Sequence, residues 1–300
     1  MILLAGGTGR LGSLVAHRLA ERGERVRILT RDAARAAHLQ DLPIEVAIGD
    51  VRHAATLTAA LDGASVVVSA VHGFAGPGHV SPASVDRDGN ANLIDAAVAA
   101  GAEVVLLSGV GATADSPLEL FRMKHAAEVH LGASGVRATT VRPTAFAELW
   151  IELLRGTAGR SGRPLVFGRG NNPINFAAVV DVAVVVDEVT TDSSTRGTII
   201  EVGGPRDLTF NELAAAVQRA DGRTSAPRHV PPPMLAVMAN TVGRLKRELG
   251  RQARAAIAMD VMDLTWSPDR VAAGVHARPG ATTVDRLLQL QPQNVPFSTQ

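Results

Sequence analysis

Three glycines near the start of the chain, Gly6, Gly9 and Gly12, are separated by two residues each. The aliphatic residues 2–5 before them are too few for a buried helix and predict a strand, whereas the apolar residues in the range 11–19 recur at helical spacing. In such a strand–turn–helix unit, the glycines permit the reversal, let backbone amides approach a pyrophosphate and let the helix pack closely on the strand. A purely structural glycine turn is the alternative. We expect a dinucleotide at the helix N-terminus, held by Gly6, Thr8, Gly9, Arg10, Leu11 and Gly12.

A second predicted strand, residues 26–29, ends at the position that distinguishes NAD from NADP. An acidic residue there would hold the ribose 2′-hydroxyl of NAD, and a basic residue nearby would accommodate the 2′-phosphate of NADP. Here Thr30 occupies the acidic position and Arg31 follows it, while Arg10 in the glycine turn could reach the same phosphate. Alternatively, Asp32 takes the acidic role and Arg31 is an ordinary surface charge. We expect NADP(H) to be preferred over NAD(H).

Further candidates stand where other predicted strands end, because ligands bind at the carboxyl ends of strands in open α/β sheets. These strands are expected at 44–48, 65–69, 103–107 and 136–141. The candidates that follow them are Asp50, Val51, Ala70, Val71, His72, Ser108, Pro143 and Thr144. Asp50 could bond an adenine amino group or cap the helix expected at 53–61. His72 could line the nicotinamide site or be an ordinary solvated side chain, in a glycine-rich loop that could act as a mobile lid.

Short aliphatic strands alternate with helical segments through the first half of the chain. This pattern is typical of a doubly wound parallel sheet. We therefore predict an α/β, Rossmann-like fold with a smaller, mostly helical and discontinuous C-terminal region. The dinucleotide-binding domain is expected at residues 1–147, with its sheet completed by 174–202. Residues 148–173 and 203–290 would form the smaller, substrate-side region, and 291–300 a flexible tail.

The charged residues nearly balance, with 30 basic and 29 acidic side chains and a net charge of +1. This balance gives no electrostatic footprint for nucleic acid or an anionic membrane. The chain has no cysteine, which excludes disulfides, thiolate catalysis and cysteine-ligated metals, and we expect no metal site. It has no uninterrupted run of roughly 18 apolar residues, so no membrane span is expected. Because the first predicted strand begins at Ile2, without room for a signal peptide, we expect a cytoplasmic protein.

Five features follow one another along the chain: the glycine turn, Arg31, Ser108, Lys124 with Glu128, and the segment 134–143 that contains the sixth predicted strand. Their order and spacing resemble the short-chain dehydrogenase/reductase superfamily. Within it, the chain resembles the atypical NmrA-like, NAD(P)H-binding branch, whose later landmarks are similar to the segments 175–183, 201–205 and 208–213. The resemblance covers roughly residues 1–215. It implies a Rossmann-like, NAD(P)H-binding protein.

The chain departs from the superfamily at one catalytic position. Superfamily reductases carry a tyrosine four residues before the active-site lysine, where this chain has Leu120, and the chain contains no tyrosine at all. Carbonyl reduction driven by a tyrosine is therefore not expected. By resemblance, Lys124 hydrogen-bonds the nicotinamide ribose; in isoflavone-reductase-like relatives the lysine itself is the acid–base group, which makes Lys124 our catalytic candidate. The alternative is a helix-surface ion pair between Lys124 and Glu128.

The predicted function is that of an NADP(H)-dependent oxidoreductase that transfers hydride to an apolar, unsaturated acceptor such as a quinone, enone or imine, without a catalytic tyrosine. Such acceptors ask less of a side-chain proton donor, because the developing charge is delocalised or water can protonate it. The protein would mainly hold donor and acceptor at reacting distance. The backbone at Pro143 and Thr144 would face the carboxamide. The alternative is a non-catalytic NADP(H)-binding sensor that acts through a protein partner. A small-molecule apolar substrate is expected, and a homo-oligomer or a protein partner is left open.

Overall fold

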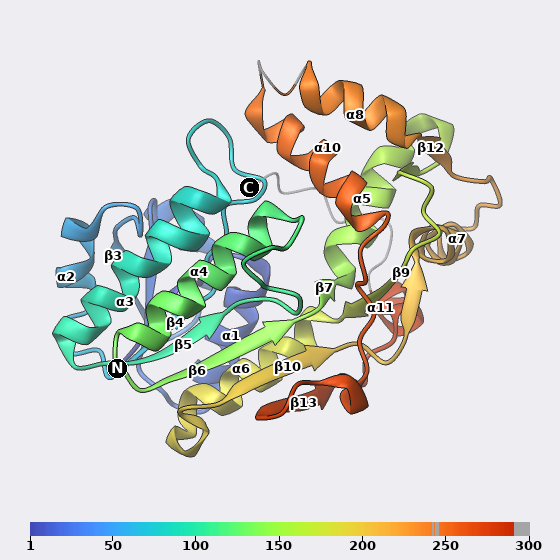
Figure 1. The fold of residues 1–300 in the computed structure, drawn as a ribbon. Coiled ribbons are helices and arrows are strands. Elements are labelled where there is room, and N and C mark those ends of the chain that lie inside the picture. Colours follow the sequence, from blue (N-terminus) through green and yellow to red (C-terminus); the bar gives the residue numbers. More distant parts are fainter. Residues whose placement is uncertain (242, 244–245, 291–300) are drawn as a thin grey trace.

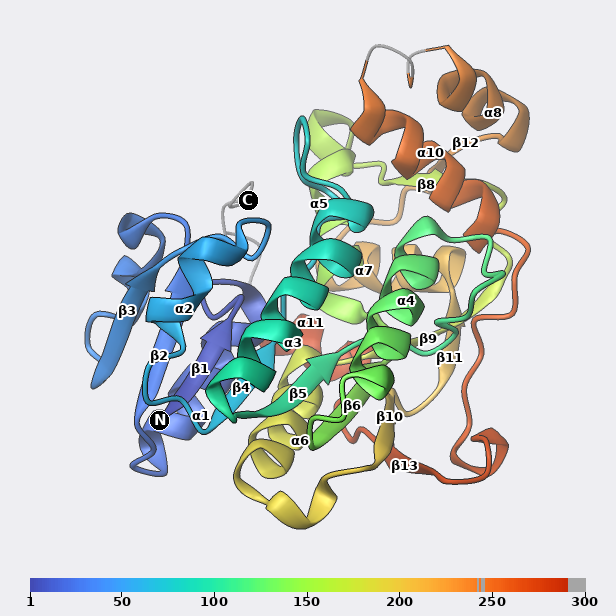
Figure 2. The same cartoon turned by 60° about the vertical axis from the view of Figure 1, so that its left-hand side comes forward.

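The strands predicted in the first half of the chain are present and join one large sheet. The computed structural model describes residues 1–241, 243 and 246–290; the tail expected at 291–300 lies outside the described residues. Eight strands of the described part pair in parallel throughout: β1 (Ile2–Ala5), β2 (Val26–Thr30), β3 (Ile44–Ile48), β4 (Val66–Ser69), β5 (Glu103–Leu107), β6 (Ala138–Pro143), β10 (Ile199–Gly203) and β13 (Val275–Pro279). Their order is β13-β10-β6-β5-β4-β1-β2-β3 (Figures 1 and 2).

Helices cover both faces of this sheet, as Figures 1 and 2 show. Alternate residues of β1 point to opposite faces, and each face has its own apolar core. Ile2 and Leu4 pack with the helices α1 (Arg10–Glu21) and α6 (Val179–Thr191), whereas Leu3 and Ala5 pack toward α2 (Leu57–Ala60), α3 (Asp88–Ala100) and α4 (Glu119–Ala133). Each fully buried leucine or isoleucine contributes about 1.5–3 kcal/mol to the stability of this arrangement. The doubly wound α/β prediction is thus confirmed.

The strand order reverses between β1 and β4, which lie side by side although the chain continues from β1 to β2. Ile2 pairs with Val26 on one side and with Val66 on the other. At such a switch point the loops leave in opposite directions, so the carboxyl ends of the two strands leave room for a ligand. The glycine turn follows β1 and the loop with His72 follows β4, so both stand at this point.

A smaller region contains two small sheets, an apolar core and five further helices, within the part of the chain that the structure describes. β7 (Ala145–Phe146), β9 (Pro173–Ala177) and β11 (Asp207–Thr209) form one sheet, and β8 (Leu165–Phe167) pairs with β12 (Arg228–Val230). The helices are α5 (Ala147–Ala158), α7 (Phe210–Ala220), α8 (Pro232–Asn240), α10 (Arg247–Met259) and α11 (Val284–Leu290). The ring of Phe210 packs edge to face on Trp150 and Phe176, with centroids 4.7 and 5.8 Å apart.

One predicted feature of the large sheet is wrong. Residues 174–202 were expected to complete it, but only β10 joins it, whereas β9 pairs with β7 and β11. The side chain of Asn175 explains the difference, because it bonds to Gly204 and Asp207 and so holds β9 against β11. The eighth strand of the large sheet comes instead from β13, in the range 203–290 that was expected to belong to the smaller region. The proposed division into two domains stays a prediction.

Candidate cofactor and active site

The glycine turn is held by backbone contacts that only glycine allows at two of its three positions. Gly6 has a φ of +86°, and a Cβ there would lie 2.6 Å from the carbonyl oxygen of Ala70. A Cβ on Gly12 would lie 2.1 Å from the carbonyl oxygen of Gly6. The N–H of Gly9 donates to that same oxygen at 3.0 Å and closes the turn. Gly6 and Gly12 are therefore required by the fold itself.

Gly9 is different, because the described protein leaves the space beside it open. A Cβ on Gly9 would meet only the Gly6 carbonyl oxygen within 4 Å, at 3.3 Å. Gly9 is also the N-cap of α1, with no side chain capping the helix and no acidic residue in its first turn. The first N–H groups of a helix have no partner within it and favour an anion. The fold thus supplies an anion-binding terminus beside a glycine on which packing places no strong demand.

The two arginines expected to bind one phosphate have different surroundings. Arg10 forms an ion pair with Glu152 of α5. Arg31 is exposed at the end of β2 and lies near enough to Asp50 to contribute to the lowered pKa of that carboxyl. The main cause of the lowered pKa is Arg52, whose guanidinium donates to Asp50 at 2.5–3.1 Å. The charge of Arg31 thus acts on Asp50, whose carboxylate is already paired with Arg52.

The carboxylate of Asp32, the alternative ribose ligand, has a local partner. It accepts a hydrogen bond of 2.9 Å from the N–H of Ala34 and caps the 3-10 helix η1 (Ala33–Leu39). The hydroxyl of Thr30 donates to the Asp32 carbonyl at 2.9 Å and fixes the end of β2. Asp50 does not cap the next helical segment, because it accepts from the N–H of Arg52 instead. Val51 is buried, and its carbonyl accepts from Asn92 of α3 at 2.9 Å.

Lys124 is buried, with 8% of its surface exposed, and it does not pair with Glu128. Its Nζ donates to the carbonyl oxygen of Leu107 at 3.0 Å and lies 3.3 Å from Oδ1 of Asp86. Glu128 binds Arg142 instead, at 2.9 and 2.5 Å. The surface-pair alternative for Lys124 is therefore wrong. Lys124 reaches the carboxyl end of β5, beside the switch point of the sheet.

Ala70, Val71 and His72 continue the chain from the end of β4. Ala70 donates to the carbonyl of Ala5 at 2.9 Å and lies directly against Gly6. His72 is exposed, yet desolvation by the surrounding protein lowers the pKa of its imidazole; the Asp86 carboxylate opposes that shift and the Lys124 ammonium adds to it. His72, Asp86 and Lys124 are thus electrostatic neighbours.

Ser108, Pro143 and Thr144 lie at the ends of β5 and β6. The Oγ of Ser108 is buried and has no hydrogen-bond partner among the described residues. The Pro143 carbonyl accepts from Val110, and the Thr144 N–H donates to Val202, each within the protein. These two backbone groups are therefore already bonded, whereas the Ser108 hydroxyl is available to a ligand. The roles of all three residues stay predictions.

An apolar cluster lies beside Lys124. Leu118, Ala255 and Ala258 form its buried part, and Phe74, Phe121, Met259 and Met262 pack against it. The ring of Phe121 lies on the backbone after β5, where a Cβ on Gly109 or Gly111 would come within 3.3 Å of it. This cluster brings together the loop after β4, α4 and α10, so an apolar wall stands close to the buried lysine.

The loop that follows β4 is fixed from α10. The guanidinium of Arg251, which is buried, donates from Nη2 to the carbonyl oxygens of Phe74, Gly76 and Val80 at 3.1–3.3 Å. The sequence suggested a mobile lid at this loop, yet three of its carbonyls are held by one side chain. Arg251 lies 171–177 residues away from them in the chain, so no local pattern could indicate this contact.

Sequence reasoning also missed Asp86, the partner of Lys124, although one signal was available. The chain has 30 basic residues, but lysine occurs only at positions 124 and 246. Where nearly all basic residues of a chain are arginine, a lysine within a helix is a candidate for acid–base chemistry. Arginine cannot perform that chemistry, because a buried lysine can lose its proton and an arginine cannot.

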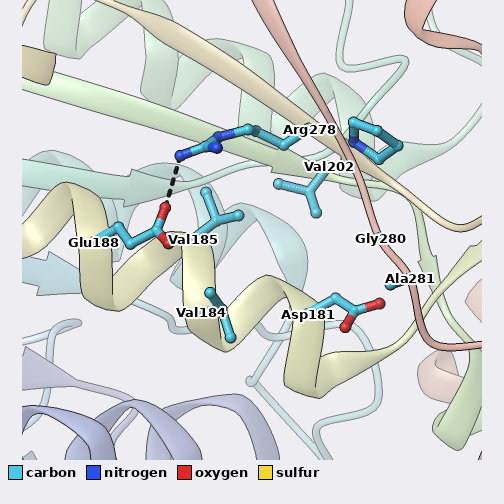
Figure 3. Close-up of a pocket in the computed structure, with 9 residues that line it drawn as sticks. Asp181, Val184, Val185, Glu188, Val202, Arg278, Gly280 and Ala281 are labelled. Carbon is cyan, nitrogen blue, oxygen red and sulfur yellow. Dashed lines mark hydrogen bonds and ion pairs between the residues drawn. The ribbon is translucent and has the colours of Figure 1, made fainter.

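A pocket elsewhere on the molecule is unrelated to these residues. It lies between α6 and β13, with Asp181, Glu188 and Arg278 in its wall (Figure 3). Glu188 binds Arg278 at 2.6 Å, and Asp181 accepts from the N–H and hydroxyl of Thr282 at 2.8 Å. These contacts attach β13 and the turn after it to α6. None of the residues predicted to bind a cofactor lines this pocket.

Comparison with known proteins shows the family and the fold of this chain. The model of the NmrA-like family matches residues 1–272. The chain belongs to the NmrA-like family. This NmrA-like chain is 30% identical over 284 residues, 94% of its own length and 93% of the other's, to an NAD(P)H azoreductase of Xenophilus azovorans. It is 26% identical to the photosystem II assembly factor Ycf39 of Synechocystis, over 79% and 72% of the two chains.

The fold is shared with a solved structure as well. An NADPH-dependent quinone oxidoreductase of Escherichia coli, in complex with NADPH, superposes with a TM-score of 0.75 at 22% identity, over 97% of this chain and 99% of that one. The resemblance predicted from the motifs, and the Rossmann-like fold that it implied, are thereby confirmed. No helix in the described part of this NmrA-like chain is long and apolar enough to cross a membrane.

Proposed function

We propose that this chain is an NADPH-dependent reductase that passes hydride to an apolar, unsaturated acceptor: a quinone, an enone, an imine or an azo compound. One observation carries the proposal: a buried lysine, Lys124, at the carboxyl edge of the sheet that bears the glycine turn, in a chain without tyrosine. The similar azoreductase and quinone oxidoreductase support the reaction class. The apolar cluster of Phe74, Phe121 and Met259 supports an acceptor without charge.

The residues present fit a nicotinamide dinucleotide. The open space at Gly9 and the uncapped N-terminus of α1 suit a diphosphate. The unpartnered hydroxyl of Ser108 and the ammonium of Lys124 suit the sugar and the nicotinamide end. When bound, the cofactor supplies the hydride. Lys124 holds the ribose and donates a proton to the reduced acceptor where the acceptor needs one, and the loop fixed by Arg251 excludes water on the apolar side.

The preference for NADPH over NADH rests on the end of β2. Arg31 is exposed there, and the carboxylate of Asp32 is engaged with Ala34 in capping η1 rather than free for a ribose hydroxyl. A guanidinium binds a phosphate through charge-assisted hydrogen bonds. Arg10 contributes to this phosphate only after it leaves Glu152, so Arg31 carries the preference.

NADPH fluorescence tests the proposal. The purified protein is mixed with NADPH, and quinones, enones, imines and azo compounds are then added one at a time. We expect the fluorescence to brighten on binding and to decay only when both protein and one acceptor class are present. An absence of any change on adding protein would show that the glycine turn is structural and would overturn the cofactor assignment.

The second candidate, an NADP(H)-binding sensor, is favoured by one observation: the similar Ycf39 protein is named for assembly rather than for a reaction. A sensor would bind NADPH and leave it unconsumed with every acceptor, and its oligomeric state or partner binding would differ between NADPH and NADP⁺. Size-exclusion chromatography with each form of the cofactor distinguishes the two functions.

A further inference from the structure

Asp86 has no exposed surface and faces Lys124 across the end of β5. Its Oδ1 lies 3.3 Å from the Lys124 Nζ, and its Oδ2 accepts a hydrogen bond of 2.8 Å from the N–H of Gly73. The ammonium also donates a hydrogen bond of 3.0 Å to the Leu107 carbonyl. An ammonium has three N–H groups, so one of them has no acceptor among the described residues.

The backbone before α3 explains why Asp86 can reach this place. Residues Ala83–Arg87 form a π-helical turn, which inserts an extra residue and changes the direction of the side chains that follow. Two further buried groups brace the turn: Asn90 donates to the Asp86 carbonyl at 2.8 Å and accepts from Ser69 at 2.5 Å. The polar network around Lys124 thus contains groups from four elements: β4, the π-helical turn, α3 and β5.

An apolar pair would suit a purely structural role better than this ion pair. Removing a carboxylate and an ammonium from water costs more free energy than their attraction returns, unless hydrogen bonds satisfy both groups. Here hydrogen bonds do not satisfy every polar atom: among the described residues, Asp86 Oδ1 has no hydrogen-bond partner, and neither has Oγ of Ser108, the residue after Leu107. Unfilled polar positions that converge at the carboxyl edge of a sheet indicate a ligand rather than a packing role.

We propose that Asp86 is a positioning residue: its carboxylate holds the ammonium group of Lys124 oriented so that one N–H stays available to a molecule bound at the end of β5. His72 is the other titratable group that faces the pair, from the loop whose Gly73 amide binds Asp86. The kinetic part of this inference rests on the proposed function, whereas the structural part does not.

The lysine content of the chain allows a direct test. Selective ¹⁵N labelling of lysine gives two Nζ signals, one from buried Lys124 and one from Lys246, which is exposed and serves as an internal reference. Asp86→Asn keeps an oxygen that can accept from Gly73 but removes the charge. We expect the chemical shift of the Lys124 Nζ signal to change in this variant, since the ammonium group loses the charged partner that lies 3.3 Å from it. The Lys246 signal stays unchanged.

The matched control is Asp95→Asn on α3, the helix that follows the turn with Asp86; this carboxylate is exposed and pairs with His130. In turnover, Asp86→Asn should lower kcat by roughly 10- to 100-fold, as loss of orientation does, and leave the Kd for NADPH within about twofold. Asp95→Asn should leave both unchanged. An identical Lys124 Nζ signal in the wild type and in Asp86→Asn would overturn the inference, whatever the kinetics.

A second pair of variants covers the case in which Asp86→Asn does not fold. Lys124→Met leaves the Asp86 carboxylate buried without its partner, so the double variant Lys124→Met/Asp86→Asn should melt at a higher temperature than Lys124→Met alone. Equal melting temperatures would overturn the inference. If the wild type oxidises NADPH with none of the acceptors, the proposed function fails, and the ¹⁵N signal of Lys124 still decides the role of Asp86.

Discussion

Arg251 donates a hydrogen bond of 3.1 Å to the carbonyl oxygen of Val80, and this contact joins α10 to the loop that follows β4. The same guanidinium holds Phe74 and Gly76 of that loop. Because Phe74 packs with Met259 and Met262, near the C-terminal end of α10, helix and loop form one wall beside Lys124. The position of α10 therefore sets the width of the proposed acceptor site.

Arg251→Met tests this wall. The change leaves three loop carbonyls without their donor, so the free energy of unfolding should fall by about 1–3 kcal/mol. With the loop released, the KM for a bulky aromatic acceptor should rise about tenfold, since positioning is lost, while the Kd for NADPH stays the same. Arg254→Met, on the same helix and exposed, is the control. An unchanged KM in Arg251→Met would show that the loop holds its position without α10.

Two glycines of the turn should respond to alanine in opposite ways. Gly12→Ala places a methyl group 2.1 Å from the Gly6 carbonyl and should destabilise the fold by about 1–3 kcal/mol. Gly9→Ala meets only one protein atom and should leave the melting temperature nearly unchanged. Since that methyl group occupies the path to the pyrophosphate, the Kd for NADPH should rise at least about tenfold. NADPH binding as tight as in the wild type would remove Gly9 from the site.

The 2′-phosphate assignment depends on Arg31. Arg31→Ser should weaken NADPH binding by about 10- to 100-fold, because a charge-assisted contact contributes about 1.5–3 kcal/mol, and should leave NADH binding within about twofold. Arg25→Ser, at the exposed other end of β2, is the control and should change neither affinity. Isothermal titration with both cofactors measures the difference. Equal losses for NADPH and NADH would contradict the assignment.

Glu148 should make stability dependent on pH. The side chain is buried in α5, where it accepts hydrogen bonds from the Val179 N–H at 2.9 and 3.1 Å, and burial raises its pKa above 4.5. The folded state thus binds the proton more tightly than the unfolded state, so stability is lost as pH rises from 4.5 through the raised pKa. Glu148→Gln removes this pH-dependent loss of stability.

Urea unfolding across that range measures the effect. The stability of Glu148→Gln relative to the wild type should increase as pH rises and level off above the raised pKa. Glu188→Gln, which changes a half-exposed carboxylate in an ion pair with Arg278, is the control for the loss of a charge. A constant difference between Glu148→Gln and the wild type at all pH values would show that burial does not perturb Glu148.

Local patterns in the sequence were sufficient for the first six strands and for the glycine turn. Residues 2–12 contain strand, turn and helix in direct succession, and each depends on neighbours within a few positions. Local patterns do not indicate which sheet a short apolar strand joins. Residues 174–202 were expected to complete the large sheet, but the strand Pro173–Ala177 joins the small sheet, held by the bond from Asn175 to Asp207, 32 residues away. No periodicity carries that information.

The candidate site divides in the same way. Gly6, Gly9 and Gly12 were recognised from their spacing, and Lys124 from its place in a family pattern. Its partner was not, because Asp86 reaches Lys124 only through a π-helical turn. Helical spacing suggested that Lys124 pairs with Glu128. Glu128 instead accepts two hydrogen bonds from Arg142 of β6.

The late position of β13 in the chain affects how the large sheet can form during synthesis. β10 pairs with β6 on one side and with β13 on the other, but residues 275–279 leave the ribosome long after residues 199–203. Until then, the N–H and C=O groups along one side of β10 have no strand beside them, as on any edge strand. The nascent chain therefore exposes an unpaired strand edge while α7, α8 and α10 are being made, until the residues of β13 have been synthesised.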